Sequence, residues 1–211
     1  MAAPRRERGS ADGPVSVERI EEAAVRLFGE KSYSVVGMRD ISEAVGILPG
    51  SLYVHIRKKE DLLLRIVERG IRNYLDVIQT AATSGLPAPD RLRGAIVAYM
   101  RVLAGSLPQT RVAFHQWTYL SPPGQERVIE LRRQYENLFF AIVADGIAKQ
   151  EFRAIPNPRI AVLAIIGMLN SATEWFSPDG DLSAEEVGQL LADSALSGLH
   201  RAPEAGASGT G

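Results

Sequence analysis

Helical periodicity is the feature of this sequence that most restricts its fold. Apolar residues recur every three or four positions through most of the 211-residue chain, and glycine or proline interrupts the pattern at intervals. This spacing places the apolar side chains on one face of each helix. No stretch alternates strictly between apolar and polar residues, as a half-buried strand would. The sequence therefore predicts an all-α fold of about nine helices.

The glycine and proline breaks set the expected helix boundaries. One long helix over residues 59–82 would measure roughly 30 Å at 1.5 Å per residue, which is long enough to link two lobes. Ser16 can cap the first helix, and Ser183 with Glu186 forms a capping box at the start of the last. The other expected helices cover residues 17–31, 38–45, 49–55, 90–104, 110–119, 124–149, 157–176 and 184–199.

Composition excludes several classes of protein. The chain has no cysteine, so disulfides, thiolate metal sites and cysteine nucleophiles are ruled out. Its three histidines are scattered, and it has no nucleophile elbow, metal-spaced cluster or phosphate-binding glycine loop. We therefore expect no enzyme, no metal and no cofactor. The polar N-terminus is not a secretory signal, and no apolar run approaches the ~20 residues of a membrane span, so we expect a cytoplasmic protein with no membrane partner.

The most specific pattern lies in residues 38–59. Gly46 separates two short helices and can take the positive φ that a sharp turn between crossed helices requires. Ile41 and Leu52 are spaced to pack between these helices, and Pro49 suits the first turn of the second one. This is the pattern of a helix-turn-helix, whose second helix lies in the major groove of DNA.

Short polar and basic side chains gather on this second helix and just after it. Gly50 and Ser51 allow close backbone approach, and Tyr53 and His55 can donate to phosphate oxygens. The candidate DNA-binding residues are Arg39, Leu48, Pro49, Gly50, Ser51, Tyr53, His55 and Lys59. Taken singly, each of them also fits an ordinary helical hairpin with a solvated surface. Their order along the chain favours DNA binding.

That order resembles the DNA-binding head of the tetracycline-repressor (TetR) family over residues 17–67. The matching stretches are 20–28, 38–41, 44–47, 50–53, His55 and 59–62. The resemblance implies a homodimer in which each head places a recognition helix in the major groove of a near-palindromic operator. The composition of the N-terminal end predicts a disordered arm, the resemblance implies a DNA-binding head followed by a ligand-binding and dimerisation body, and the composition of the C-terminal end predicts a disordered tail. These parts would cover residues 1–14, 15–58, 59–200 and 201–211.

Three positions depart from the family pattern. Leu48 stands where the family usually has a serine or similar cap for the recognition helix. Ile56 replaces an aromatic residue, and Gly37 replaces a capping threonine or serine. These changes leave the phosphate contacts available, but they bear on how rigidly the recognition helix is held when the protein is free.

The body helices of the family enclose an apolar pocket and form a four-helix bundle between subunits. Helix 157–176 is apolar on nearly all sides and must be covered on several of them. The candidate dimer residues are Leu163, Ile166, Val187, Leu190 and Leu191. The candidate ligand contacts are Tyr99, Met100, Leu103, Phe114, Trp117, Tyr135, Phe139 and Met168. The alternative interpretation is that the candidate dimer residues and the candidate ligand contacts are simply buried in the core of one subunit.

The resemblance implies a ligand-responsive repressor that binds double-stranded operator DNA and is released by a small hydrophobic effector. An effector bound in the body would shift helix 59–82 and move the heads out of register. Residues 46–53, 151–153 and 175–183 resemble regulators of lipid and sterol catabolism within the family, which commonly respond to acyl-CoA thioesters. An uncharged hydrophobic compound is the other effector class. The alternative functions are a helical adaptor without DNA binding and a transcriptional activator of the same fold.

Overall fold

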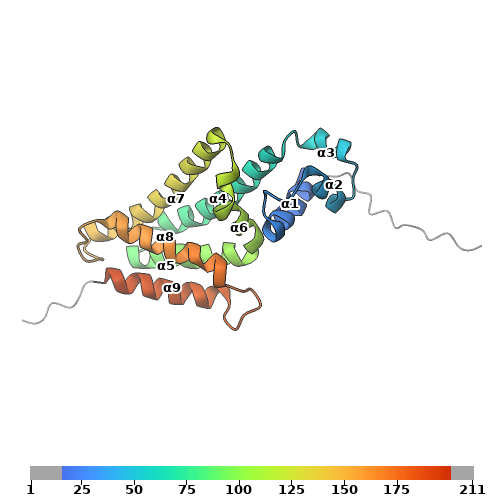
Figure 1. The fold of residues 1–211 in the computed structure, drawn as a ribbon. Helices are drawn as coiled ribbons and strands as arrows, with labels where there is room; N and C mark the ends of the chain where they lie inside the picture. The colour runs from blue at the N-terminus through green and yellow to red at the C-terminus, as the bar shows by residue number, and fades with distance from the viewer. Residues whose placement is uncertain (1–15, 201–211) are drawn as a thin grey trace, which may run out of the picture.

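The computed structural model describes residues 16–200, and every regular element within them is helical (Figure 1). The predicted all-α fold is therefore confirmed. The expected disordered segments at 1–14 and 201–211 lie outside the described residues. In chain order the elements are α1 (Val17–Lys31), α2 (Met38–Val45), α3 (Pro49–His55), α4 (Lys59–Ala82), α5 (Ala88–Gly105), α6 (Leu107–His115), the 3-10 helix η1 (Trp117–Tyr119), α7 (Pro122–Ala148), α8 (Pro158–Trp175) and α9 (Ala184–Leu199).

Helices α1 to α4 and α9 begin and end where the sequence predicts. The single helix predicted over 110–119 is wrong, because α6 begins at Leu107 and ends at His115, and η1 follows as a separate turn. Pro108 explains the early start. Backbone N–H groups in the first turn of a helix have no partner within the helix, so proline, which has no N–H, is well suited to this position. Helices α5 and α7 begin two residues earlier than predicted for the same reason.

Two predicted caps are present. The Ser16 side chain accepts a hydrogen bond from the N–H of Arg19 over 3.3 Å at the start of α1. At the start of α9, the Ser183 hydroxyl accepts from the N–H of Glu186 over 3.2 Å. The Glu186 carboxylate accepts in return from the N–H of Ser183 over 2.8 Å, which completes the capping box.

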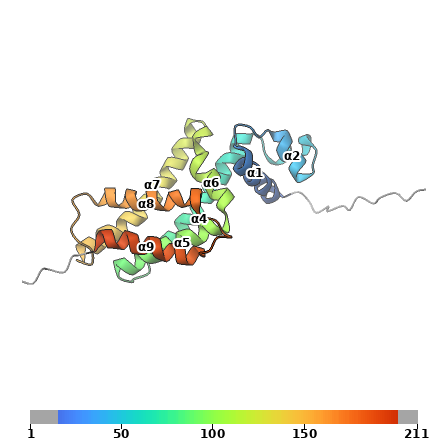
Figure 2. The same cartoon turned by 60° about the horizontal axis from the view of Figure 1, so that its bottom comes forward.

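The buried side chains form two clusters that share α4. One cluster joins α1, α2 and α3 to the first half of α4, with Leu62 and Ile66 fully buried in it. The other joins the second half of α4, through Tyr74 and Ile78, to helices α5 to α9. Helix α9 lies along α5 in both views (Figures 1 and 2). No helix within residues 16–200 is long and apolar enough to cross a membrane.

Candidate nucleic-acid interface and effector site

Helices α2 and α3 meet at a left-handed turn. Gly46 has φ +80°, and its N–H donates to the carbonyl oxygen of Ser42 over 3.0 Å. Ile41 and Leu52 are fully buried between the two helices. The glycine is needed because residues with a side chain rarely adopt this backbone conformation. The helix-turn-helix geometry predicted from the spacing is present.

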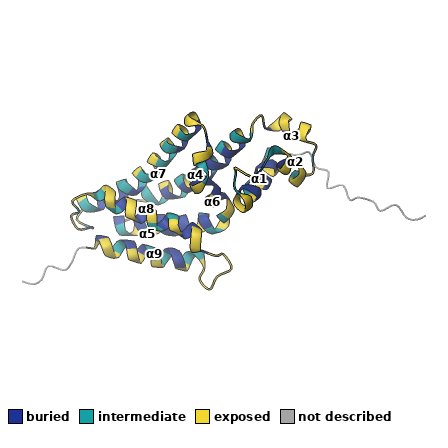
Figure 3. Ribbon diagram, viewed as in Figure 1, coloured by how far each residue is buried: buried dark blue, intermediate teal, exposed yellow. Residues whose placement is uncertain are grey.

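Helix α3 stands exposed at the end of the molecule away from α9 (Figure 3). Six of its seven residues are exposed, and only Leu52 turns inward. The structure brings the predicted DNA-binding residues to this surface, with Arg39 on the neighbouring α2. Val54 also lies here with 81% of its surface exposed, and the sequence reading missed it. The sequence did contain a signal for Val54, because it is an apolar residue between Tyr53 and His55, two polar positions of the recognition helix.

Lys59 differs from the other predicted DNA-binding residues. Its Nζ donates to the carbonyl oxygen of Tyr33 over 2.8 Å and to that of Val36 over 2.7 Å. The ammonium also lies 4.1 Å from the centre of the Tyr33 ring. Burial lowers the pKa of Lys59, and the nearby carboxylate of Asp40 opposes this effect. Lys59 therefore links the start of α4 to the loop between α1 and α2, and these hydrogen bonds occupy two of its three N–H donors.

Two buried carboxylates tie α1, α4 and α7 together. Glu21 of α1 pairs with Arg65 over 2.9 Å and with Arg69 over 2.5 Å, both on α4. Glu68 of α4 pairs with Arg127 of α7 over 2.6 Å. Both carboxylates are less than a tenth exposed. A buried carboxylate is stable only when it is paired in this way, so these contacts fix α1 and α7 to the same stretch of α4.

Seven of the eight predicted ligand contacts lie in or against the apolar cluster of the body, while Trp117 packs against the cluster of the head. Six are buried, while Trp117 and Met168 are partly exposed. Tyr74 of α4, which was not among the predicted ligand contacts, packs against two of them. The Tyr74 ring centre lies 4.6 Å from that of Tyr99 and 5.4 Å from that of Phe114. The aromatic cluster therefore connects α4 directly to α5 and α6.

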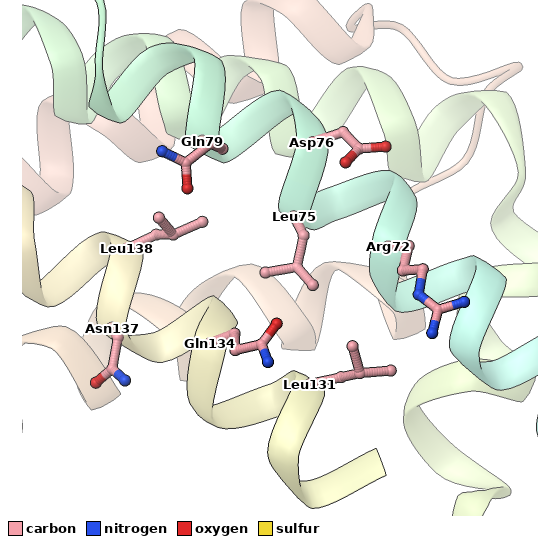
Figure 4. A pocket seen from close by; sticks show the side chains of 8 residues that line it. All are labelled: Arg72, Leu75, Asp76, Gln79, Leu131, Gln134, Asn137 and Leu138. Atoms are coloured by element: carbon pink, nitrogen blue, oxygen red, sulfur yellow. The ribbon is translucent and has the colours of Figure 1, made fainter. Parts of the chain in front are cut away.

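An open groove of about 480 Å³ runs between α4 and α7 (Figure 4). Three half-buried leucines, Leu75, Leu131 and Leu138, give it an apolar surface. The remaining lining residues are polar: Arg72, Asp76, Gln79, Gln134 and Asn137. None of the eight predicted ligand contacts lines this groove. The sequence of either helix alone does not predict this groove, because a groove between two helices depends on how they pack together.

The predicted dimer residues divide into two groups. Leu163 and Leu190 are 48% and 55% exposed, although both are large and apolar. Ile166 and Val187 are buried within the core of the single chain, and Leu191 packs partly against that core. Two further large apolar residues of α8 are exposed: Ile160 at 61% and Trp175 at 53%.

Family models match most of the described chain. Residues 20–66 match the model described as bacterial regulatory proteins, tetR family. Residues 85–199, more than half of the chain, match the model described as tetracyclin repressor-like, C-terminal domain. Among curated relatives, the HTH-type transcriptional repressor KstR2 of Mycolicibacterium smegmatis is 28% identical over 194 residues, which cover 86% of this chain and 89% of the relative.

Solved structures share the fold across most of its length. PfmR, a TetR family transcriptional regulator from Thermus thermophilus, is 31% identical with a TM-score of 0.80, covering 87% of this chain and all of that one. AibR, solved in complex with isovaleryl coenzyme A and operator DNA, is 22% identical with a TM-score of 0.75. The match to AibR covers 86% of this chain and 96% of AibR. At this identity it shows a shared fold.

Proposed function

The chain belongs to the TetR family of bacterial transcriptional regulators, and from this premise we propose that it is a dimeric repressor released from its operator by an acyl-type effector. The observation that carries the proposal is the exposure of α3 beside a correctly formed helix-turn-helix. No contact within residues 16–200 uses the outer face of this helix for packing. A recognition helix in a major groove needs such a face.

The outward side chains of α3 match the chemistry of a DNA groove. Tyr53 and His55 supply donors for phosphate oxygens, and Gly50 and Ser51 let the backbone approach closely. Val54 is apolar and 81% exposed, which suits the C5-methyl group of thymine in the major groove. Each head would therefore read base edges through the first turns of α3 and anchor itself on the flanking phosphates.

We place the boundary between head and body at residues 58 and 59, so that the head covers 15–58 and the body 59–200. Helix α4 starts the body and reaches both apolar clusters. A displacement of α4 would therefore move α3, because only three residues separate the two helices. A bacterial repressor works in the cytoplasm, where the chromosome lies, and we propose this location.

The exposed apolar residues of α8 and α9 supply the dimer face. Ile160, Leu163 and Trp175 project from α8, and Leu190 projects from α9. Large exposed apolar side chains gathered on neighbouring helices mark an interaction surface. A two-fold axis through this face would give two α3 helices spaced for successive major grooves, about 34–36 Å apart.

The effector is proposed to be an acyl compound such as an acyl-CoA thioester. AibR shows that this fold can bind isovaleryl coenzyme A and operator DNA. The groove between α4 and α7 has a volume within the range of small-molecule sites. A thioester of coenzyme A also needs cations for its phosphates. Arg72 lines this groove, and Arg159 lies over the Phe140 ring at the neighbouring α7–α8 seam.

The proposed release couples this groove to α3 through α4. An effector that separates α4 from α7 changes the position of the helix that follows α3. It releases the operator only if it binds the DNA-incompetent state more tightly than the DNA-bound state. Helix α6 takes part, because it contacts both α4 and α1.

The test is fluorescence anisotropy of the purified protein on its own upstream DNA. We expect binding that weakens steeply with salt and is released by a long-chain acyl-CoA but not by free CoA. The double variant Tyr53→Phe with Val54→Ala should weaken binding at least tenfold. Tyr119→Phe is the matched control, because Tyr119 is also exposed but lies in η1. Unchanged affinity in the α3 variant would remove α3 as the DNA-binding face, and tighter binding with the acyl-CoA would indicate an activator.

A further inference from the structure

Helix α7 carries two buried donor groups that form no hydrogen bond. Within residues 16–200, Nη1 of Arg132 and the hydroxyl of Tyr135 are buried and have no hydrogen-bond partner. The two residues are three positions apart on one helix, so their side chains lie on neighbouring parts of the same face. Buried polar groups are nearly always paired, and two neighbouring exceptions point to a ligand.

Tyr135 is the more deeply placed of the two. It is 3% exposed, and its ring packs against Phe139 with the ring centres 5.5 Å apart. Burial raises the pKa of Tyr135 well above its ordinary value, Tyr74 adds to the rise, and the charge of Arg132 opposes it. The hydroxyl therefore keeps its proton and is available as a donor.

Arg132 has aromatic neighbours in place of a carboxylate. Its guanidinium carbon lies 5.8 Å from the ring centre of Phe114 and 5.4 Å from that of Trp117. Arg127 and Arg133 on the same helix each pair with a glutamate. Arg132 forms no such pair with any carboxylate of the described chain. A cation held among aromatic rings, with a free N–H, is suited to an acceptor that arrives with a ligand.

We propose that Arg132 and Tyr135 form a clasp for the acyl oxygen of the effector. The chemistry fits a carboxylate or thioester carbonyl, because such oxygens only accept hydrogen bonds and both protein groups donate them. A free fatty acid and its coenzyme A thioester share this oxygen. The inference rests on the proposed function, since it names the group through which the effector of that repressor is held.

The α4–α7 groove provides the place for the apolar chain. Leu131 and Leu138 line the groove and lie four residues before and three residues after Tyr135, so they share its side of α7. Tyr135 does not line the groove, so the polar end of a chain lying over these leucines would have to enter between α4 and α7 to reach the buried hydroxyl, as the proposed separation of these two helices by the effector requires. From there Arg132 connects to Phe114 of α6, and Phe114 packs against Tyr74 of α4. Binding at the clasp therefore acts on the helix that leads to α3.

The first arm of the test needs no ligand. Tyr135→Phe removes a hydroxyl that has no partner, so we expect the melting temperature of the free protein to rise by about 2–4 °C. Tyr74→Phe is the matched control, because the Tyr74 hydroxyl is equally buried but is 2.8 Å from the Thr110 hydroxyl. That variant should melt at a lower temperature. A lower melting temperature for Tyr135→Phe would show that its hydroxyl is already satisfied and would overturn the clasp.

The second arm measures binding of palmitate and of palmitoyl-CoA through intrinsic tryptophan fluorescence, to which Trp117, lying against Arg132, contributes together with Trp175. We expect saturable binding of at least one probe, weakened tenfold or more by Arg132→Met and by Tyr135→Phe. Arg133→Met is the control, since Arg133 is its exposed neighbour on α7. The tighter probe identifies the free acid or the thioester as the source of the oxygen. Binding unchanged in Arg132→Met, or no binding of either probe, would overturn the proposal.

The two proposals fail in different measurements. Operator binding by the wild-type protein without lipid tests the repressor and does not involve the clasp. If the operator is not bound but the probes bind through Arg132 and Tyr135, the clasp stands and the repressor is wrong. If the operator is bound and released by palmitoyl-CoA while both variants bind the probe normally, the repressor stands and the clasp is wrong.

Discussion

Gln116, the C-cap residue directly after α6, donates from its side-chain Nε2 to the backbone carbonyl oxygen of Phe28 in α1 over 2.8 Å. Its Oε1 accepts from the backbone N–H of Tyr33 over 2.7 Å. The Phe28 carbonyl oxygen also accepts from the backbone N–H of Ser32 over 3.0 Å, so Gln116 is its second donor, whereas the N–H of Tyr33 lies in the loop after α1 and has no partner within the helix. One amide side chain directly after α6 therefore bonds to both sides of the end of α1 and makes a polar contact between the end of α6 and the DNA-binding head.

Replacing Gln116 with alanine should weaken both stability and signalling. The change leaves the N–H of Tyr33 without its partner and removes one of the two donors to the Phe28 carbonyl oxygen, so we expect a loss of about 1–3 kcal/mol in the free energy of unfolding. With this contact removed, the acyl-CoA should release the operator less effectively. Urea unfolding and anisotropy with increasing acyl-CoA check the two effects.

Gln125→Ala is the matched control for this experiment. The Gln125 side chain also makes two hydrogen bonds, to the carbonyl oxygens of Thr118 and Leu120, but both are local to η1 and the start of α7. It should lose stability while keeping the effector response. An equal loss of response in both variants would mean that Gln116 has no special part in coupling.

Gly70 sets the distance between α4 and α6. A Cβ atom at this position would lie 2.8 Å from the Cβ of Ala113, which is closer than side chains approach. Gly70→Ala should therefore cost about 1–3 kcal/mol, even though alanine favours a helix. Ala113→Gly in the same chain should restore most of the loss, and the coupling would appear in a double-mutant cycle of urea unfolding.

Gly94→Ala serves as the comparison for Gly70→Ala. Gly94 also lies inside a helix, but a Cβ there would meet only the Cβ of Ala81, at an ordinary 3.7 Å. This variant should be neutral or more stable by up to about 1 kcal/mol, as helix propensity dictates. If Gly70→Ala behaves in the same way, the close crossing of α4 and α6 does not constrain the fold.

Local pattern explains why α1 to α4 could be predicted to the residue. Their boundaries depend on short-range signals, such as the Ser16 cap and the left-handed Gly46, which act within one or two turns. Prolines were harder to interpret. Pro108 reads as a break in the sequence, but in the structure it occupies the first turn of α6 and lengthens the helix toward the N-terminus.

The body site could not be predicted because it depends on how distant helices pack. Tyr99 and Phe139 are apolar at helical spacing, and this pattern is the same for a core and for a pocket. The α4–α7 groove joins Leu75 to Leu138, which are 63 positions apart. Arg132 and Tyr135 can be recognised as candidate ligand contacts only once the structure shows that their buried donor groups have no hydrogen-bond partner. The DNA face was easier, because its residues follow one another along a single short helix.

Leu48 offers a test of how firmly the recognition helix is held. It occupies the N-cap position of α3 with φ −67° and ψ 145°, but its side chain cannot accept a hydrogen bond. Leu48→Ser supplies an acceptor for the free N–H groups of the first turn, and we expect a gain of about 1 kcal/mol. Hydrogen exchange of the α3 amides should slow. Leu48→Ala removes the same apolar surface without adding a cap, so equal exchange in the two variants would contradict the capping argument.

Glu60 ties the first turn of α4 to the start of α7, and this contact should depend on pH. Its Oε1 accepts from the backbone N–H of Ser121 over 2.8 Å. Hydrogen bonds from the side chain and backbone of Ser121 lower the pKa of Glu60 below its ordinary value of 4.5. The unfolded chain therefore takes up this proton at a higher pH than the folded chain does. The contact stabilises the fold fully above the unfolded pKa, and the stabilisation is lost as the pH falls through the lower folded pKa.

Glu60→Gln should flatten the acid limb of the stability profile. Above the unfolded pKa the variant should be less stable than the wild type, because an amide oxygen accepts a weaker hydrogen bond than a carboxylate does. The two proteins should converge in acid, where the wild-type carboxyl group is protonated as well. Thermal unfolding across this pH range measures both curves, and Glu126→Gln, which removes a carboxylate elsewhere on α7, controls for the change in net charge. A constant difference between wild type and Glu60→Gln at every pH would show that the contact acts through packing alone.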